Sequence, residues 1–243
     1  MDILYIVMPA YNEEAVIEKT IKEWYPIIED KCDESRLVIA DSGSRDSTHE
    51  ILERLKEVFP KLIVLSDTQK EHGPKVMALY SFSIQNGADF IFQTDSDGQT
   101  NPDEFCSFWN LRNEKDAVIG VRTVRGDGIS RKLVENILCV LLGIYFGIRI
   151  KDANAPYRLM KAEILKKYIQ RLPENYNLPN VMLTTYFTYY KENIEFKEIS
   201  FGARQSGKNS INFRKIIKTG WKSLQEFYMF RKNMNKVNAK SVK

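Results

Sequence analysis

Four apolar segments in the first half of the chain each end in small, polar or acidic residues. The polar ends read MPAYNEE at 8–14, ADSGSRDS at 40–47, TDSDGQ at 94–99 and GVR at 120–122. In open α/β sheets, ligands bind in the crevice outside the carboxyl ends of the strands. If the apolar segments are neighbouring parallel strands, their four polar ends form one shared binding crevice.

Asp95 and Asp97 are the natural candidates for binding a metal ion. Two carboxylates one residue apart after a strand can both reach one hard cation, and Gln99 adds an amide oxygen. A divalent ion there would offset the negative charge of a nucleotide diphosphate. The same short pattern also arises by chance in solvated turns, so the hypothesis depends on the position of the pair at a strand end.

Asp41 and a late glycine–lysine segment are further candidates for nucleotide binding. Asp41 ends an apolar strand, where its carboxylate either accepts hydrogen bonds from a base or ribose or caps the next helix. The segment from Gly202 to Lys208 has nearly the spacing of a phosphate-binding loop, but Asn209 stands where that loop requires Ser or Thr. We therefore reject a P-loop. Arg204 and Lys208 remain either contacts for phosphate oxygens or solvated loop charges.

Three arginines precede the longest uncharged apolar run of the chain. Arg122, Arg125 and Arg131 come before residues 137–148, which read ILCVLLGIYFGI. This run is too short to span a bilayer, which needs roughly 20 residues. Basic residues beside a short apolar helix suit the phosphate headgroup of a lipid; the alternative is a helix buried in the core.

The elements that must position these candidates alternate between β-rich and helical patterns, which is typical of an α/β domain with a mostly parallel central sheet flanked by helices. We expect strands at 4–8, 37–41, 62–66, 90–94 and 117–121, with helices at about 13–29, 46–58, 74–86 and 102–112 between them. In the second half we expect loops at 122–130 and 151–158, helices near 161–170 and 179–191, and a strand at 194–201.

The charge of the chain is divided unevenly. The net charge of the 243 residues is +4, yet residues 211–243 hold nine basic residues and one acid, so residues 1–210 sum to −4. An acidic body with a basic end is not typical of a nucleic-acid binder. Two His and three Cys argue against a zinc cluster and a disulfide framework. We expect a catalytic domain over 1–210 and a basic amphipathic helix and tail over 211–243.

The expected C-terminal helix, at about 211–232, places Trp221, Phe227 and Tyr228 on one face with lysines on its flanks. Such a helix either lies on an anionic membrane surface or packs on the domain. The first residues read directly into a strand and lack the basic start of a signal peptide. We therefore expect a protein at the cytoplasmic face of a membrane.

Taken in order, the motifs of the chain resemble the family 2 glycosyltransferases, and most closely their dolichol-phosphate mannosyltransferase and polyprenyl-phosphate sugar transferase branch. The resemblance covers about residues 3–210. It is carried by MPAYNEE (8–14), DSGSRDST (41–48), GPK (73–75), DSDGQ (95–99), GVR (120–122), DANAPYR (152–158) and RQSGK (204–208).

This resemblance implies a GT-A fold, a nucleotide-sugar donor (UDP- or GDP-sugar) and inversion at the anomeric carbon. Matched residue by residue, the nucleoside would be held by Pro9, Tyr11, Glu13, Ile39 and Asp41. Mg²⁺ or Mn²⁺ on the donor diphosphate would be held by Asp95, Asp97 and Gln99, with Ser96 in the same nucleotide-sugar site. The donor and acceptor phosphates would be bound by Arg122, Arg131, Arg204 and Lys208. The implied catalytic residues are Asp97, Arg122 and Arg131.

The chain departs from the family pattern at three places. Ser42 replaces the second acid of the usual Asp pair, and Ser210 stands where the branch often has a closing Lys. Val134 and Glu135 occupy the neighbourhood of the family's acceptor-helix Ser. Many relatives also carry transmembrane helices after the catalytic domain.

The acceptor follows from the need for a general base. A phosphate is already ionised near neutral pH, whereas a sugar hydroxyl needs a positioned Asp or Glu to remove its proton. Residues 178–183, where relatives with hydroxyl acceptors carry an acidic pair, contain no acid. We therefore expect a polyprenyl-phosphate acceptor. The alternatives are a family 2 transferase that acts on a sugar hydroxyl in a surface polysaccharide, a nucleotidyltransferase, and an inactive binding protein.

Overall fold

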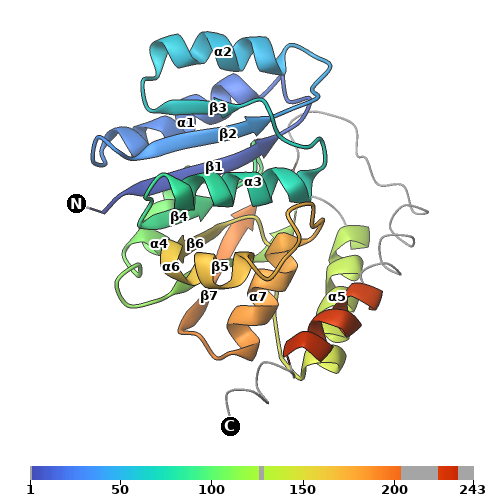
Figure 1. The fold of residues 1–243 in the computed structure, drawn as a ribbon. Coiled ribbons are helices and arrows are strands. Elements are labelled where there is room, and N and C mark those ends of the chain that lie inside the picture. The colour runs from blue at the N-terminus through green and yellow to red at the C-terminus, as the bar shows by residue number, and fades with distance from the viewer. Residues whose placement is uncertain (1, 126–128, 204–223, 235–243) are drawn as a thin grey trace.

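The structure is a computed structural model that describes residues 2–125, 129–203 and 224–234. Its centre is a seven-stranded sheet with the strand order β3-β2-β1-β4-β6-β5-β7 (Figure 1). The strands are β1 (Leu4–Ala10), β2 (Arg36–Asp41), β3 (Leu62–Leu65), β4 (Phe90–Gln93), β5 (Ala117–Arg125), β6 (Arg158–Lys161) and β7 (Ile194–Phe201). Within the described residues, β6 alone runs against the others, because it pairs antiparallel with both β4 and β5. The expected α/β class with a mostly parallel sheet is confirmed.

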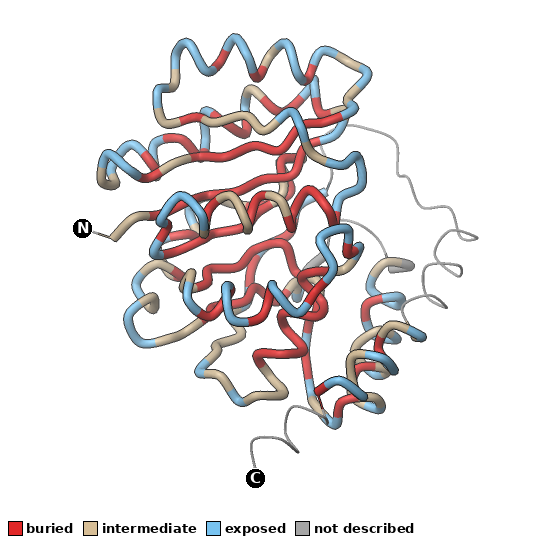
Figure 2. The backbone as a smooth tube through the Cα atoms, in the orientation of Figure 1, coloured by how far each residue is buried: buried red, intermediate tan, exposed pale blue. Residues whose placement is uncertain are grey.

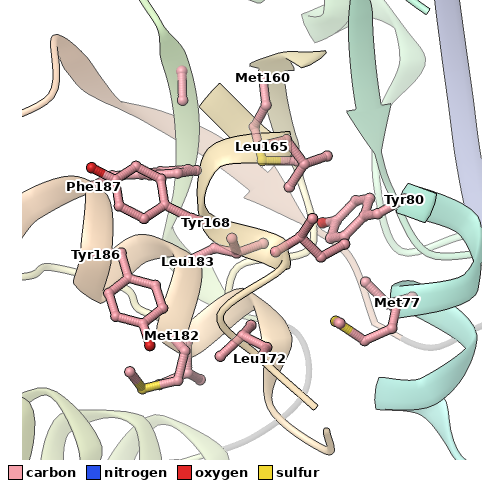
Figure 3. Packing of buried hydrophobic residues seen from close by; sticks show 14 of the residues in the cluster. Met77, Tyr80, Met160, Leu165, Tyr168, Leu172, Met182, Leu183, Tyr186 and Phe187 are labelled. Atoms are coloured by element: carbon pink, nitrogen blue, oxygen red, sulfur yellow. The ribbon is translucent and has the colours of Figure 1, made fainter. Parts of the chain in front are cut away.

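Helices cover both faces of this sheet. They are α1 (Ile17–Glu29), α2 (Thr48–Val58), α3 (His72–Gln85), α4 (Phe105–Trp109), α5 (Ile129–Phe146), α6 (Ala162–Ile169) and α7 (Pro179–Tyr189), and a 3₁₀ turn, η1, spans Pro102–Glu104. One core joins the sheet to α1, α2 and α4, and a second core joins it to α3, α5, α6 and α7. Figure 3 shows part of the second core, where Tyr168, Tyr186 and Phe187 pack together.

The central strands are buried on both sides. In β1, Tyr5 and Val7 face the α3 core while Ile6 and Met8 face the α1 core, as the two-residue repeat of a strand requires. Figure 2 shows the same strands as continuous buried segments. Burial on both faces explains why these segments are apolar throughout and why they could be predicted within a few residues.

The register of β1 decides where the chemistry-bearing loops meet. β1 pairs in parallel with β2, with Ala10 opposite Asp41, and in parallel with β4, with Val7 opposite Gln93. The chain segments that follow these strands therefore leave the sheet at the same edge. They carry Tyr11 and Glu13, the 42–47 turn, and Asp95 and Asp97.

Two expectations for the second half were only partly correct. Residues 151–157 lie outside helices and strands as expected, but Arg158 begins strand β6, which was not expected. Residues 122–130 were also expected to form a loop, whereas β5 continues to Arg125 and α5 already begins at Ile129. The unexpected strand residues are explained by long-range pairing, of β6 with β4 and of β5 with β7, which overrides the polar local sequence.

The apolar run at 137–148 is neither wholly buried in the core nor wholly exposed. Leu142 and Phe146 are buried in the core, whereas Ile137, Val140 and Ile144 on the same helix are 52%, 62% and 73% exposed. No helix among the described segments is long and apolar enough to cross a membrane.

Residues 224–234 form a helix that packs beside α5 (Figure 1). The Phe227 ring centroid lies 6.1 Å from that of Phe146, and the Phe230 centroid lies 5.4 Å from that of Tyr176. Phe227 is 1% exposed, while Tyr228 is 63% exposed and therefore does not share its face. Residues 211–223, including Trp221, lie outside the described residues.

We expect Phe227→Ala to lower the free energy of unfolding by about 3 kcal/mol, because it opens a cavity between α5 and the C-terminal helix. Tyr228→Ala is the matched control and should change stability by less than about 0.5 kcal/mol. Urea denaturation of both variants measures the difference. Equal stabilities would show that the C-terminal helix is not docked in solution.

Candidate active site

A cleft of about 630 Å³ opens at the carboxyl ends of β1 and β4. Its walls include most of the residues that the sequence nominated. Those present are Pro9, Tyr11, Glu13, Asp95, Ser96, Asp97 and Arg131. The structure therefore brings some members of each expected set, for the nucleoside, the metal and the phosphates, into one cleft, although these residues are separated by up to 122 positions in the sequence.

Asp95 and Asp97 fit a divalent cation. The Oδ1 atom of Asp95 is buried and has no hydrogen-bond partner; the Nε2 atom of His72 lies 3.5 Å from it. The Oδ1 atom of Asp97 accepts a hydrogen bond from the backbone N–H of Gln99 at 3.2 Å. The described residues contain no group of three or more His, Cys, Asp or Glu that could hold a metal. Two carboxylates with substrate phosphates and water are a common ligand set for Mg²⁺.

The side chains of Gln99 and Ser96 each donate a hydrogen bond to a backbone carbonyl. The Gln99 Nε2 atom donates to the carbonyl of Gly202 at 2.7 Å, and Gly202 N–H donates to the Gln99 carbonyl at 2.8 Å. Gln99 lines a neighbouring hollow of about 490 Å³ instead. The Ser96 hydroxyl donates to the Pro9 carbonyl at 2.9 Å and ties the end of β4 to the end of β1.

Asp41 and Ile39 do not line the cleft. Ile39 is fully buried in the core against α1 and α2. The Asp41 side chain is 1% exposed, and its carboxylate accepts from the Ser44 hydroxyl and lies 3.3 Å from Nδ1 of His49. Because the Ser44 hydroxyl also accepts from the backbone N–H of Asn12, Asp41 organises the loops beneath the cleft.

Lys75 is a site residue to which the sequence assigned no role. Its ammonium is buried, donates to the Ala10 carbonyl and lies 5.3 Å from the ring centroid of Tyr11. Burial lowers the pKa of Lys75, and the carboxylates of Asp41 and Glu71 oppose that shift. The sequence signal that could have identified Lys75 was its place in the GPK motif at 73–75.

Lys70, Glu71 and His72 also line the cleft. They come from the turn that leads into α3. The first turn of this helix packs closely against residue 177. A Cβ on Gly73 would lie 2.4 Å from the Asn177 carbonyl oxygen, so only glycine allows this approach.

Arg122 belongs to a buried charge network and does not line the cleft. Its Nε and Nη2 atoms each donate to the Asp152 carboxylate at 2.8 Å, and Nη2 lies 3.6 Å from Glu135. Glu135 accepts from the backbone N–H of Ala153 at 2.8 Å. Arg131 is therefore the nominated arginine that the structure places in the cleft, while Arg204 and Lys208 lie outside the described residues.

The family model for glycosyl transferase family 2 matches residues 5–169. The chain belongs to glycosyltransferase family 2. Among curated relatives, undecaprenyl-phosphate 4-deoxy-4-formamido-L-arabinose transferase of Photorhabdus laumondii is 24% identical over 213 residues, which cover 87% of this chain and 64% of that protein. Undecaprenyl-phosphate mannosyltransferase of Micrococcus luteus is 26% identical over 166 residues, 66% of this chain and 67% of that one. The chain thus spans about two thirds of these relatives.

The fold of this glycosyltransferase also matches a solved structure. Glucosyl-3-phosphoglycerate synthase from Mycobacterium tuberculosis, in complex with Mn²⁺, UDP-glucose and phosphoglyceric acid, superposes with a TM-score of 0.68 at 18% identity, over 95% of this chain and 79% of that chain. This likeness confirms the expected GT-A-like fold.

We expect Asp95→Asn and Asp97→Asn each to weaken Mn²⁺-dependent binding of a nucleoside diphosphate at least about tenfold, because each removes one of the two carboxylate charges expected to hold the metal. Isothermal titration with UDP and GDP, with and without Mn²⁺, measures the effect.

Asp103→Asn serves as the control, since Asp103 is an exposed acid just beyond the same turn. A loss of affinity in this control equal to that in the Asp95 and Asp97 variants would contradict a specific metal role for the pair.

Proposed function

We propose that this glycosyltransferase moves a sugar from a UDP- or GDP-sugar to a polyprenyl phosphate at a membrane surface. One observation carries the proposal. Arg131, at the amino end of α5, lines the cleft that holds Asp95 and Asp97, and the rest of α5 presents an exposed apolar face. A donor phosphate site and a surface suited to a lipid are therefore joined by one helix.

The reaction is a single displacement. An oxygen of the acceptor phosphate forms a bond to the anomeric carbon of the sugar, and the bond from that carbon to the nucleoside diphosphate breaks with its electron pair. Asp95 and Asp97 would hold Mg²⁺ or Mn²⁺, which stabilises the charge on the leaving diphosphate. The Arg131 guanidinium binds phosphate oxygens in a fixed orientation.

No general base is needed for this acceptor, and the start of α7 supplies none. α7 begins at Pro179 without an acid in its first turn. Asn180 is buried: its amide donates to Gln93 at 2.7 Å and accepts from the Tyr80 hydroxyl at 2.8 Å. The undecaprenyl-phosphate transferases among the relatives support the same choice of acceptor.

The membrane contact that we propose is the α5 stripe, defined as Leu133, Ile137, Val140 and Ile144. These residues recur every three or four positions and are 52–73% exposed. Tyr228 and Met229, each 63% exposed, lie on the neighbouring helix. Exposed cations lie on the same two helices, Lys132 on α5 and Lys232 on the neighbouring helix, and Arg149 follows the end of α5, while the acid of α5, Glu135, is buried. An apolar stripe flanked by cations suits an anionic membrane surface.

The acceptor is tested by measuring release of nucleoside diphosphate from UDP- and GDP-sugars, with Mg²⁺ or Mn²⁺, with and without a polyprenyl phosphate. Release that needs both metal and lipid is the expected result. Turnover with a saccharide acceptor and none with lipid would contradict the proposal and favour transfer to a sugar hydroxyl.

The membrane contact is tested with Ile137→Glu combined with Ile144→Glu. We expect co-sedimentation with vesicles that contain anionic lipid to fall about tenfold, because two charges enter the apolar stripe. Val58→Glu is the matched control, since Val58 is 65% exposed on α2. If the stripe variant binds vesicles as strongly as the control, the α5 stripe is not the contact.

A further inference from the structure

We propose that Lys70 binds a phosphate oxygen of the donor's nucleoside diphosphate and that Ser42 is the residue that positions it. The inference rests on the proposed function in one respect, which is that a nucleotide donor occupies the cleft. It assigns a role to a cation outside the motifs that carry the family resemblance. It also explains why a serine follows Asp41 in this chain.

Ser42 ties the end of β2 to the segment between β3 and α3. Its buried hydroxyl donates to the Gln69 carbonyl at 2.9 Å and lies 2.8 Å from the Thr68 hydroxyl. An ionised aspartate in this position has no proton to donate to a carbonyl. The replacement of the second acid by serine therefore creates a link to the segment that carries Lys70.

The absence of a side chain at Gly43 leaves room for the Lys70 side chain. Gly43 has a φ of +75°, and a Cβ there would lie 2.5 Å from Cε and 2.6 Å from Cγ of Lys70. Lys70 therefore lies directly over the turn that follows β2. Any side chain at residue 43 would displace it, in addition to straining the backbone.

The ammonium of Lys70 is available to a ligand. Among the described residues Lys70 makes no hydrogen bond or ion pair, although it lines the cleft. Lys75, by contrast, is buried and donates to the Ala10 carbonyl. A lysine ammonium carries three donors, so Lys70 offers the cleft an unused set.

The surroundings favour an anionic partner over a neutral one. Lys70 precedes α3, a 14-residue helix that begins at His72, and His72 lines the same cleft. The amino end of a helix carries partial positive charge and unpaired N–H groups, which favour phosphate. Oδ1 of Asp95 lies 3.5 Å from Nε2 of His72, and both residues line the same cleft as Lys70. The proposed metal and the Lys70 ammonium would therefore act on one diphosphate.

The test is isothermal titration of Lys70→Met, Lys70→Arg and Ser42→Ala with UDP and GDP, and with uridine and guanosine, in the presence of Mn²⁺. For Lys70→Met we expect affinity for the diphosphates to fall about tenfold, the loss typical of one charge-assisted hydrogen bond, with nucleoside affinity unchanged. Lys70→Arg should retain most of the affinity. Lys166→Met, an exposed lysine on α6, is the control and should bind like the unmodified protein.

The positioning role of Ser42 is tested by a double-mutant cycle. Ser42→Ala should weaken diphosphate binding in the same direction, and the double variant should bind no more weakly than Lys70→Met alone, because both changes remove one contact. Additive losses would overturn the positioning role. An equal loss for nucleosides, or no loss in Lys70→Met, would overturn the phosphate contact. Failure of the unmodified protein to bind any nucleotide would instead overturn the donor site of the proposed function, and this inference with it.

Discussion

The parallel pairing of β1 with both β2 and β4 is the constraint on which the site depends. Because these strands are buried on both faces, a shift of one residue would exchange the side chains of the two cores. The register is therefore fixed, and with it the edge at which Asp95 and Asp97 leave the sheet. Short contacts then join the loops there, including the Ser96 hydroxyl to Pro9 and the Glu13 N–H to the Thr48 hydroxyl at 2.8 Å.

A second constraint acts in the other half of the molecule. Arg122, Asp152 and Glu135 form a buried charge group that joins β5, the turn before β6 and helix α5. Buried ion pairs are costly to break because an unpaired charge remains in the interior. This group holds α5 where Arg131 reaches the cleft and the α5 stripe faces outward. Arg122 thus contributes through the position of α5, since it does not itself line the cleft.

Much of this architecture could be predicted from the sequence, for reasons that the structure makes clear. Fully buried strands such as β1 and β4 leave apolar segments, and the acids directly after them mark the cleft. Strand β6 left no such signal, since its four residues begin with Arg158 and end with Lys161. Arg158 is buried only because carbonyls such as those of Ala155 and Asn180 accept its hydrogen bonds, and burial lowers its pKa.

The residues of the site can likewise be divided into those with a local sequence signal and those without one. Three acidic residues of the cleft, Glu13, Asp95 and Asp97, follow strands and were nominated from the sequence, whereas Lys70 reaches the cleft from the turn before α3 and Lys75 from the first turn of α3. The partner of Arg122 is 30 residues away in the sequence, so its pairing could not be read from local spacing. Residues that act through tertiary contacts, such as Ser42 and Asp41, carried no local signal of their surroundings.

We expect one cleft to hold the donor nucleotide and a divalent metal together. The most direct test of this expectation is a reciprocal calorimetric titration of the unmodified protein, with UDP or GDP at several Mn²⁺ concentrations and with Mn²⁺ at several nucleotide concentrations. We expect each ligand to raise the binding affinity of the protein for the other by the same factor. Nucleotide affinity that is independent of Mn²⁺ would contradict this expectation.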